Sequence, residues 1–89
     1  MDEKIEQLKT VFDELFSLDI CNKSYIEILS DKELILSANQ EGFMCLIDEI
    51  LKLCIEKKEY YHYHLDEVGM ADKCEKDIII KYMNSPWQS

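Results

Sequence analysis

The chain has 89 residues, of which 47% are hydrophobic, with two glycines and one proline. This length fits one domain, and the hydrophobic share is enough for a compact core and argues against disorder. Nineteen acidic residues against ten lysines, with no arginine, give a formal charge of −9. That charge argues against binding to nucleic acid, because such binding depends on cations that neutralise phosphates. It favours a basic protein partner, or else it only keeps a small protein soluble.

The N-terminal segment MDEKIEQLKTVFDEL is charged from its second residue, so we expect no signal peptide and a cytoplasmic location. No apolar run approaches the roughly 20 residues of a membrane span, so we expect no membrane partner. The four cysteines, Cys21, Cys45, Cys54 and Cys74, form no CxxC pair and are expected to be reduced. Cys45 and Cys54 are expected to act as small apolar core residues.

Residues 2–17 are predicted to form an amphipathic helix, because apolar residues recur at three- and four-residue spacing. They are Ile5, Leu8, Val11, Phe12, Leu15 and Phe16. The segments YIEILS (25–30) and ELILSA (33–38) alternate apolar and polar residues around a short polar turn. This pattern predicts a β-hairpin.

Residues 39–58 are predicted to form a second helix, with Asn39 as its N-cap. Its predicted buried stripe consists of Phe43, Leu46, Ile47, Ile50, Leu51 and Cys54. The aromatic segment 59–66 is predicted to be a strand, 67–76 a loop, and 77–83 the last strand.

The expected order is therefore α-β-β-α-β-β within a single domain, 1–89. It comprises an N-terminal helix 2–17, a ββαββ core 24–83 and a short C-terminal tail 84–89. We expect a two-layer α+β fold, in which two helices pack on one face of a four-stranded, mainly antiparallel sheet. The other face would carry Ile35, Ile79 and one side of the aromatic strand, which makes it a candidate contact surface.

The segment EYYHYHLDEVGM (59–70) holds both histidines of the chain. His62 and His64 are two positions apart on a predicted strand, so their side chains share one face. A zinc site would need further ligands, and Cys74 and Asp66 are the nearest candidates, but no diagnostic spacing supports them. We therefore expect no metal and no cofactor. The chain also lacks a nucleophile elbow, a P-loop and a dinucleotide fingerprint, so we expect no catalytic residue and no enzyme.

The alternative is a protein-binding surface, since aromatic side chains provide contact area at low entropic cost. The predicted partner-binding residues are His62, His64, Asp66, Glu67 and Trp87. A second hypothesis is a self-associating structural or regulatory domain, such as a homodimer. A third is a small metal-binding or redox protein that uses His62, His64 and Cys74.

Residues 24–83 resemble the small immunity proteins of bacterial polymorphic toxin systems, in particular the immunity protein 32 type. The resemblance lies in Asn39, the Glu41-Gly42 helix opening, the leucine-rich helix, His64 with Leu65, Gly69 and the strand 78–80. Helix 2–17 lies outside it. The resemblance implies a cytoplasmic, non-enzymatic protein that binds and blocks a cognate toxin domain, which could be a basic nuclease.

Overall fold

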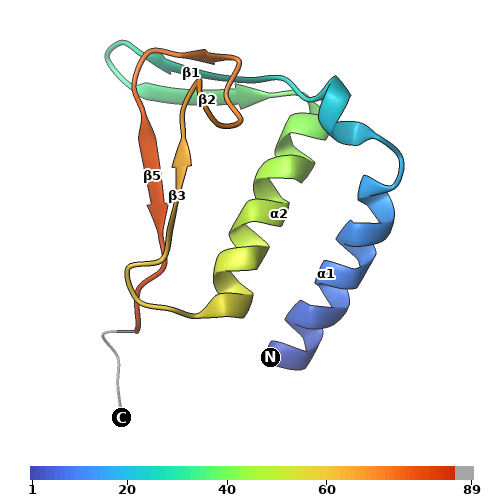
Figure 1. The fold of residues 1–89 in the computed structure, drawn as a ribbon. Helices are drawn as coiled ribbons and strands as arrows, with labels where there is room; N and C mark the ends of the chain where they lie inside the picture. The colour runs from blue at the N-terminus through green and yellow to red at the C-terminus, as the bar shows by residue number, and fades with distance from the viewer. Residues whose placement is uncertain (86–89) are drawn as a thin grey trace.

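The computed structural model describes residues 1–85. In this range the chain forms α1 (Asp2–Phe16), a short 3-10 helix η1 (Ile20–Lys23), the strands β1 (Ile26–Ser30) and β2 (Leu34–Ala38), and α2 (Gln40–Glu56). The strands β3 (His62–Leu65), β4 (Lys73–Cys74) and β5 (Ile78–Lys81) follow. Figure 1 shows α1 beside α2, with the strands on the other side of α2. The α+β class and the order of the predicted elements are confirmed, with β4 as an addition.

The strands form two sheets among the described residues, and not the single four-stranded sheet that the sequence predicts. One sheet has the order β2-β1-β4, and the other pairs β3 with β5. The β1–β2 and β3–β5 pairs are antiparallel, whereas β4 runs parallel to β1. The cause lies in the predicted loop 67–76, because this loop crosses to β1 and occupies its second edge. The β3–β5 hairpin therefore has no free edge of β1 to join.

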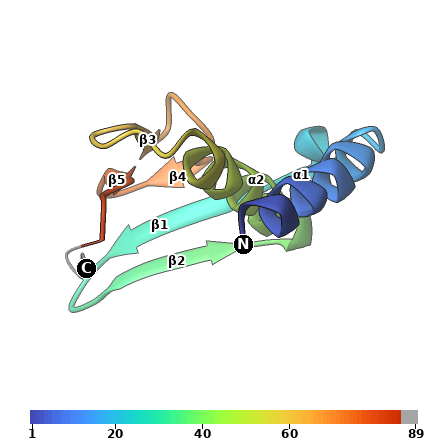
Figure 2. The same cartoon turned by 90° about the horizontal axis from the view of Figure 1, so that it is seen from below.

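The two helices also differ from the predicted single layer. α1 packs mainly against α2 and η1, so α2 lies between α1 and the strands. Figure 2 shows the same arrangement from below, with α1 far from β3 and β5. Within residues 1–85, no helix is both long and apolar enough to cross a membrane.

The start of α2 is fixed by Asn39, as predicted. Its side-chain oxygen accepts hydrogen bonds from the backbone N–H of Gly42 (2.8 Å) and of Tyr25 (2.9 Å). Its amide donates to the carbonyl of Lys23 at 2.7 Å. A helix cap normally satisfies one orphaned N–H of the first turn. Asn39 does this and also ties the helix to the chain that enters β1.

The hydrophobic core joins the two sheets through α2. Its buried members are Ile26, Ile28, Leu46, Leu65 and Ala71. Ile26 and Ile28 come from one sheet and Leu65 from the other, and all three are fully buried. Partly buried side chains from β2, β3 and β5 pack around them. The two sheets and α2 therefore share one core.

The predicted stripe of α2 is only partly correct. Leu46 and Leu51 are buried and Cys54 is half-buried, but Phe43, Ile47 and Ile50 are exposed. The reason is that α2 packs on two sides, against α1 and against the strands, and this leaves a third, apolar side open. Asp48 of α2, in contrast, is buried. Its carboxylate lies 3.1 Å from the ammonium of Lys9 in α1 and 3.6 Å from the ammonium of Lys52.

Candidate functional site

The strand β3 is shorter than predicted because the chain turns sharply at Tyr60. Tyr60 has a positive φ of 72°, a conformation that ends regular extended structure. Its carbonyl lies 2.9 Å from Nδ1 of His62. The backbone N–H of Tyr82 donates to the carbonyl of Tyr61 at 2.9 Å. These contacts fix the point at which the hairpin begins and set the orientation of the first histidine.

The hairpin separates its side chains into two faces. Leu65 is fully buried and is paired in register with Ile78, so this side faces the core. On the opposite side, His62 is paired with Lys81, and His64 with Ile79. All four of these outward residues are exposed. The sequence predicted that the two histidines share one face, and the structure shows that this face points outward.

We define the outer hairpin face as Tyr60, His62, His64, Ile79 and Lys81. The two imidazole rings meet edge to face, with centroids 4.8 Å apart. The ammonium of Lys81 lies 5.7 Å from the centre of the Tyr60 ring, a weak cation–π contact. A hollow on this face is lined by His62, Ile79 and Lys81. The face therefore combines aromatic, aliphatic and cationic groups in one exposed patch.

The additional ligands considered for a metal site are not assembled around the histidines. The thiol of Cys74 donates to Oδ1 of Asp77 at 3.4 Å, and burial and then this carboxylate raise the pKa of the thiol. Oδ1 of Asp66 accepts from the backbone N–H of Gly69 at 2.7 Å. Within residues 1–85, no three His, Cys, Asp or Glu side chains are placed to hold a metal ion.

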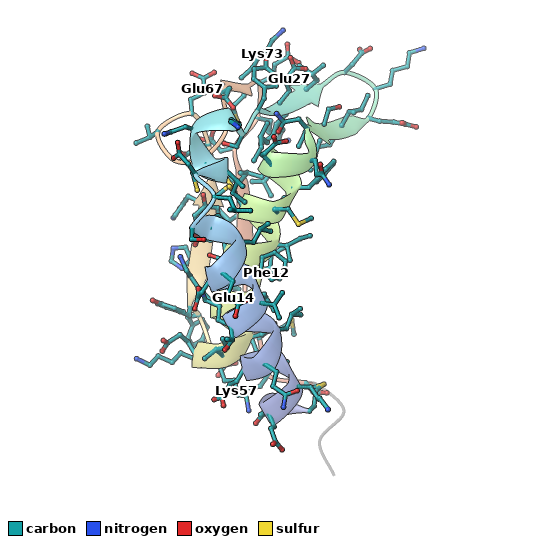
Figure 3. All side chains as sticks on the ribbon, turned by 90° about the vertical axis from the view of Figure 1, so that its right-hand side faces the viewer. Phe12, Glu14, Glu27, Lys57, Glu67 and Lys73 are labelled. Atoms are coloured by element: carbon teal, nitrogen blue, oxygen red, sulfur yellow. The ribbon has the colours of Figure 1, made fainter. Side chains whose placement is uncertain are left out.

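The predicted contact residues Asp66 and Glu67 stabilise the loop that follows β3. Asp66 accepts the Gly69 N–H, and its carbonyl accepts the N–H of Ala71 at 2.9 Å. Glu67 accepts the N–H of Cys74 at 3.1 Å. Figure 3 labels Glu67 at the same end of the molecule as Glu27 and Lys73. Trp87, the fifth predicted residue, lies outside the described residues.

Two further acids of the same loop bind β1 directly, and the sequence analysis missed them. Oδ2 of Asp72 accepts from the N–H of Ile26 at 2.9 Å, and Oε1 of Glu75 accepts from the N–H of Ser30 at 2.8 Å. The backbone adds bonds from the N–H groups of Asp72 and Glu75 to β1 carbonyls. The spacing of the acids in DEVGMADKCEKD gave no signal of these bonds. Much of the acidity of this loop therefore holds the fold together.

A second missed feature is a pair of thiols beside an open cleft. Sγ of Cys21, in η1, lies 3.4 Å from Sγ of Cys45, in α2. Burial raises the pKa of the Cys45 thiol to about 12, and the Cys21 contact adds to this. The cleft is also lined by Tyr63, Met70 and Asp72. Burial raises the pKa of Tyr63 as well.

Comparison of the chain with protein families, with characterised proteins and with solved structures finds no match. The resemblance to immunity proteins therefore remains a prediction. What the chain can bind has to follow from the surface of its described residues.

Proposed function

We propose that this chain is a non-enzymatic binding protein that acts in the cytoplasm and holds a basic partner protein, such as a cognate toxin domain, against the outer hairpin face. The observation that carries the proposal is the exposure of an aliphatic residue of β5, Ile79, and of an aromatic residue at the turn before β3, Tyr60. Ile79 keeps 59% of its surface exposed, and Tyr60 keeps 70%. Such groups supply contact area at an interface, and aromatic residues are enriched where binding energy concentrates.

The hairpin is held firmly enough to present this patch. Its inner side contributes Leu65 to the core, and Tyr63, Ile78 and Ile80 pack against that core. A rigid surface loses little conformational entropy when it binds, and more of the contact energy then appears as affinity. The two imidazoles offer hydrogen-bonding groups that can donate or accept, depending on their tautomer.

Charge supplies the second part of the proposal. The chain carries a formal charge of −9, so its long-range field attracts a basic protein and speeds its approach. Glu59 precedes the hairpin, and Asp66 and Glu67 follow β3, so acids lie at the two ends of this strand. Short-range contact would come from the patch, and orientation from the acids around it. The same charge disfavours a nucleic acid as partner.

A co-expression experiment tests this function. If a toxin-like domain is encoded next to the chain, the two are produced together, and cell survival and co-purification are measured. We expect survival together with a stable complex. Survival should be lost with His62→Ala/Ile79→Ala, which removes one polar and one aliphatic group from the patch. Asp66 is left unchanged because its carboxylate supports the loop.

The chain offers a matched control for this variant. Gln7→Ala/Val11→Ala removes one polar and one aliphatic group from α1, where Val11 is 58% exposed. This control should protect cells as well as the unmodified chain does. Loss of protection with the control but not with the hairpin variant would contradict the assignment of the surface.

Self-association is the second candidate, and a specific observation favours it. The open side of α2 carries Phe43, Ile47 and Ile50, and α1 exposes Leu8 and Val11. Apolar patches on helices often mark interfaces. The two candidates respond oppositely to salt, because screening weakens attraction to a basic partner and relieves repulsion between two acidic copies. Light scattering at low and high salt separates them: a mass that doubles at high salt supports self-association, and a constant monomer mass opposes it.

A further inference from the structure

Cys21 and Cys45 are 24 positions apart in the chain, and their sulfur atoms are 3.4 Å apart. A disulfide bond is about 2.05 Å long, so the sulfurs would have to approach by roughly 1.4 Å. Of the other three cysteines, only Cys45 contacts the sulfur of Cys21. The pair therefore differs from Cys74, whose thiol bonds to a carboxylate.

The surroundings of the pair allow such an approach. Cys21 belongs to a 3-10 helix of four residues, which starts after Asp19 in the left-handed region (φ 60°) and ends at the extended Ser24. A short segment of this kind moves more easily than α2, which carries Cys45. Cys21 is exposed, whereas Cys45 is only 3% exposed. The cleft beside the pair opens to solvent, so a small oxidant has access to the outer thiol.

We propose that Cys21 and Cys45 are a dithiol site that a hydroperoxide oxidises to an intramolecular disulfide. In the first step the sulfur of Cys21 attacks the peroxide, the O–O bond breaks, and a sulfenic acid forms as water or an alcohol leaves. In the second step the sulfur of Cys45 attacks that of Cys21, the S–O bond breaks, and the hydroxyl group leaves as water with the Cys45 proton. Two thiols are oxidised and one peroxide is reduced. A small thiol reductant cleaves the disulfide by thiol–disulfide exchange and restores both thiols.

The order of the two steps follows from burial. Cys21 is the exposed thiol, and thiols react with oxidants according to access and thiolate content. Cys45 stays protonated at neutral pH because burial raises its pKa to about 12, so it does not react alone. It reacts once the neighbouring sulfenic acid is formed within contact distance. The new bond would fasten η1 to α2 and enclose the β1–β2 hairpin.

The experiment uses the full chain, reduced and freed of reductant, with hydrogen peroxide as the probe. Mass spectrometry of the oxidised chain should show a loss of about 2 Da before any alkylation. After alkylation of the two remaining thiols and digestion, it should show a peptide linking Cys21 to Cys45. The melting temperature should rise by roughly 5–20 °C, since closing a loop of this length restricts the unfolded chain. Dithiothreitol should restore both values.

Two variants complete the test. Cys54→Ser should form the same bond, because Cys54 is not part of the pair. Cys21→Ser should lose the bond while keeping its circular dichroism spectrum, because Cys21 is exposed. Phenylarsine oxide, which bridges two adjacent thiols, should bind the unmodified chain at least tenfold more tightly than Cys21→Ser. Oxidation of Cys21 to sulfinic acid without a link, dimers joined through Cys21, or equal arsenical binding would each overturn the proposal.

Discussion

Gly42, in the first turn of α2, sits where the helix comes closest to the start of β1. A Cβ atom built there would lie 2.6 Å from the carbonyl oxygen of Tyr25 and 2.9 Å from Cγ1 of Ile26. That carbonyl cannot swing away, because it accepts the N–H of Asn39 at 3.0 Å. The alanine variant Gly42→Ala therefore forces the helix and the strand apart.

The magnitude follows from two opposing effects. Alanine favours a helix over glycine by about 1 kcal/mol. Inserting a methyl group into a tightly packed site costs roughly 1–3 kcal/mol and more when the obstacle is backbone. Since the obstacle at Gly42 is a fixed carbonyl and a fully buried side chain, the packing cost should exceed the gain. We expect a net loss of about 1–2 kcal/mol in the free energy of unfolding.

Urea unfolding followed by circular dichroism measures this loss. Gln40→Ala is the control, because it lies at the same end of α2 and is exposed, and it should stay within about 0.5 kcal/mol of the unmodified chain. An alanine variant at position 42 that equals or exceeds the stability of the unmodified chain would refute the close packing of α2 against β1.

Three further predictions concern the contacts that support the site. Asn39→Ala should lower the unfolding free energy by about 2 kcal/mol, and Asn39→Asp by less because it keeps the accepting oxygen; urea titrations compare them. Asp72→Ala leaves the N–H of Ile26 unpaired and should cost about 1–3 kcal/mol, with faster hydrogen exchange at Ile26 than in the unmodified chain. The third prediction concerns stability at alkaline pH, because the unfolded chain releases the Cys45 proton near pH 9 and the folded chain near pH 12. Stability should therefore fall as the pH rises through this window, less steeply in Cys45→Ala, whereas equal slopes would contradict the burial effect.

The features that sequence analysis predicted are those with local causes. Both α-helices and the first hairpin depend on residue spacing within one segment, and the Asn39 cap depends on neighbours three residues away. The alternation in 62–65 likewise placed His62 and His64 on one face. These signals need no knowledge of the rest of the chain.

The features that sequence analysis missed depend on partners far along the chain. β4 exists because Asp72 and Glu75 bond to a strand some 45 positions earlier, and an acidic loop shows no sign of such bonds in its periodicity. The exposed side of α2 results from the packing of α1 against one side of the helix and of the strands against another. The contact between Cys21 and Cys45 arises in the same way, since only the folded chain brings η1 against α2.

The most direct test of the proposed binding surface is an affinity comparison. Isothermal titration would measure the dissociation constant of the toxin-like domain for the unmodified chain, for His62→Ala/Ile79→Ala and for the α1 control. Truncating side chains at the centre of an interface commonly costs more than 1–2 kcal/mol, which corresponds to about tenfold or more in affinity. The account predicts at least that loss for the hairpin variant and less than a twofold change for the control. Unchanged affinity in the hairpin variant, with its fold intact by circular dichroism, would contradict binding at the outer hairpin face.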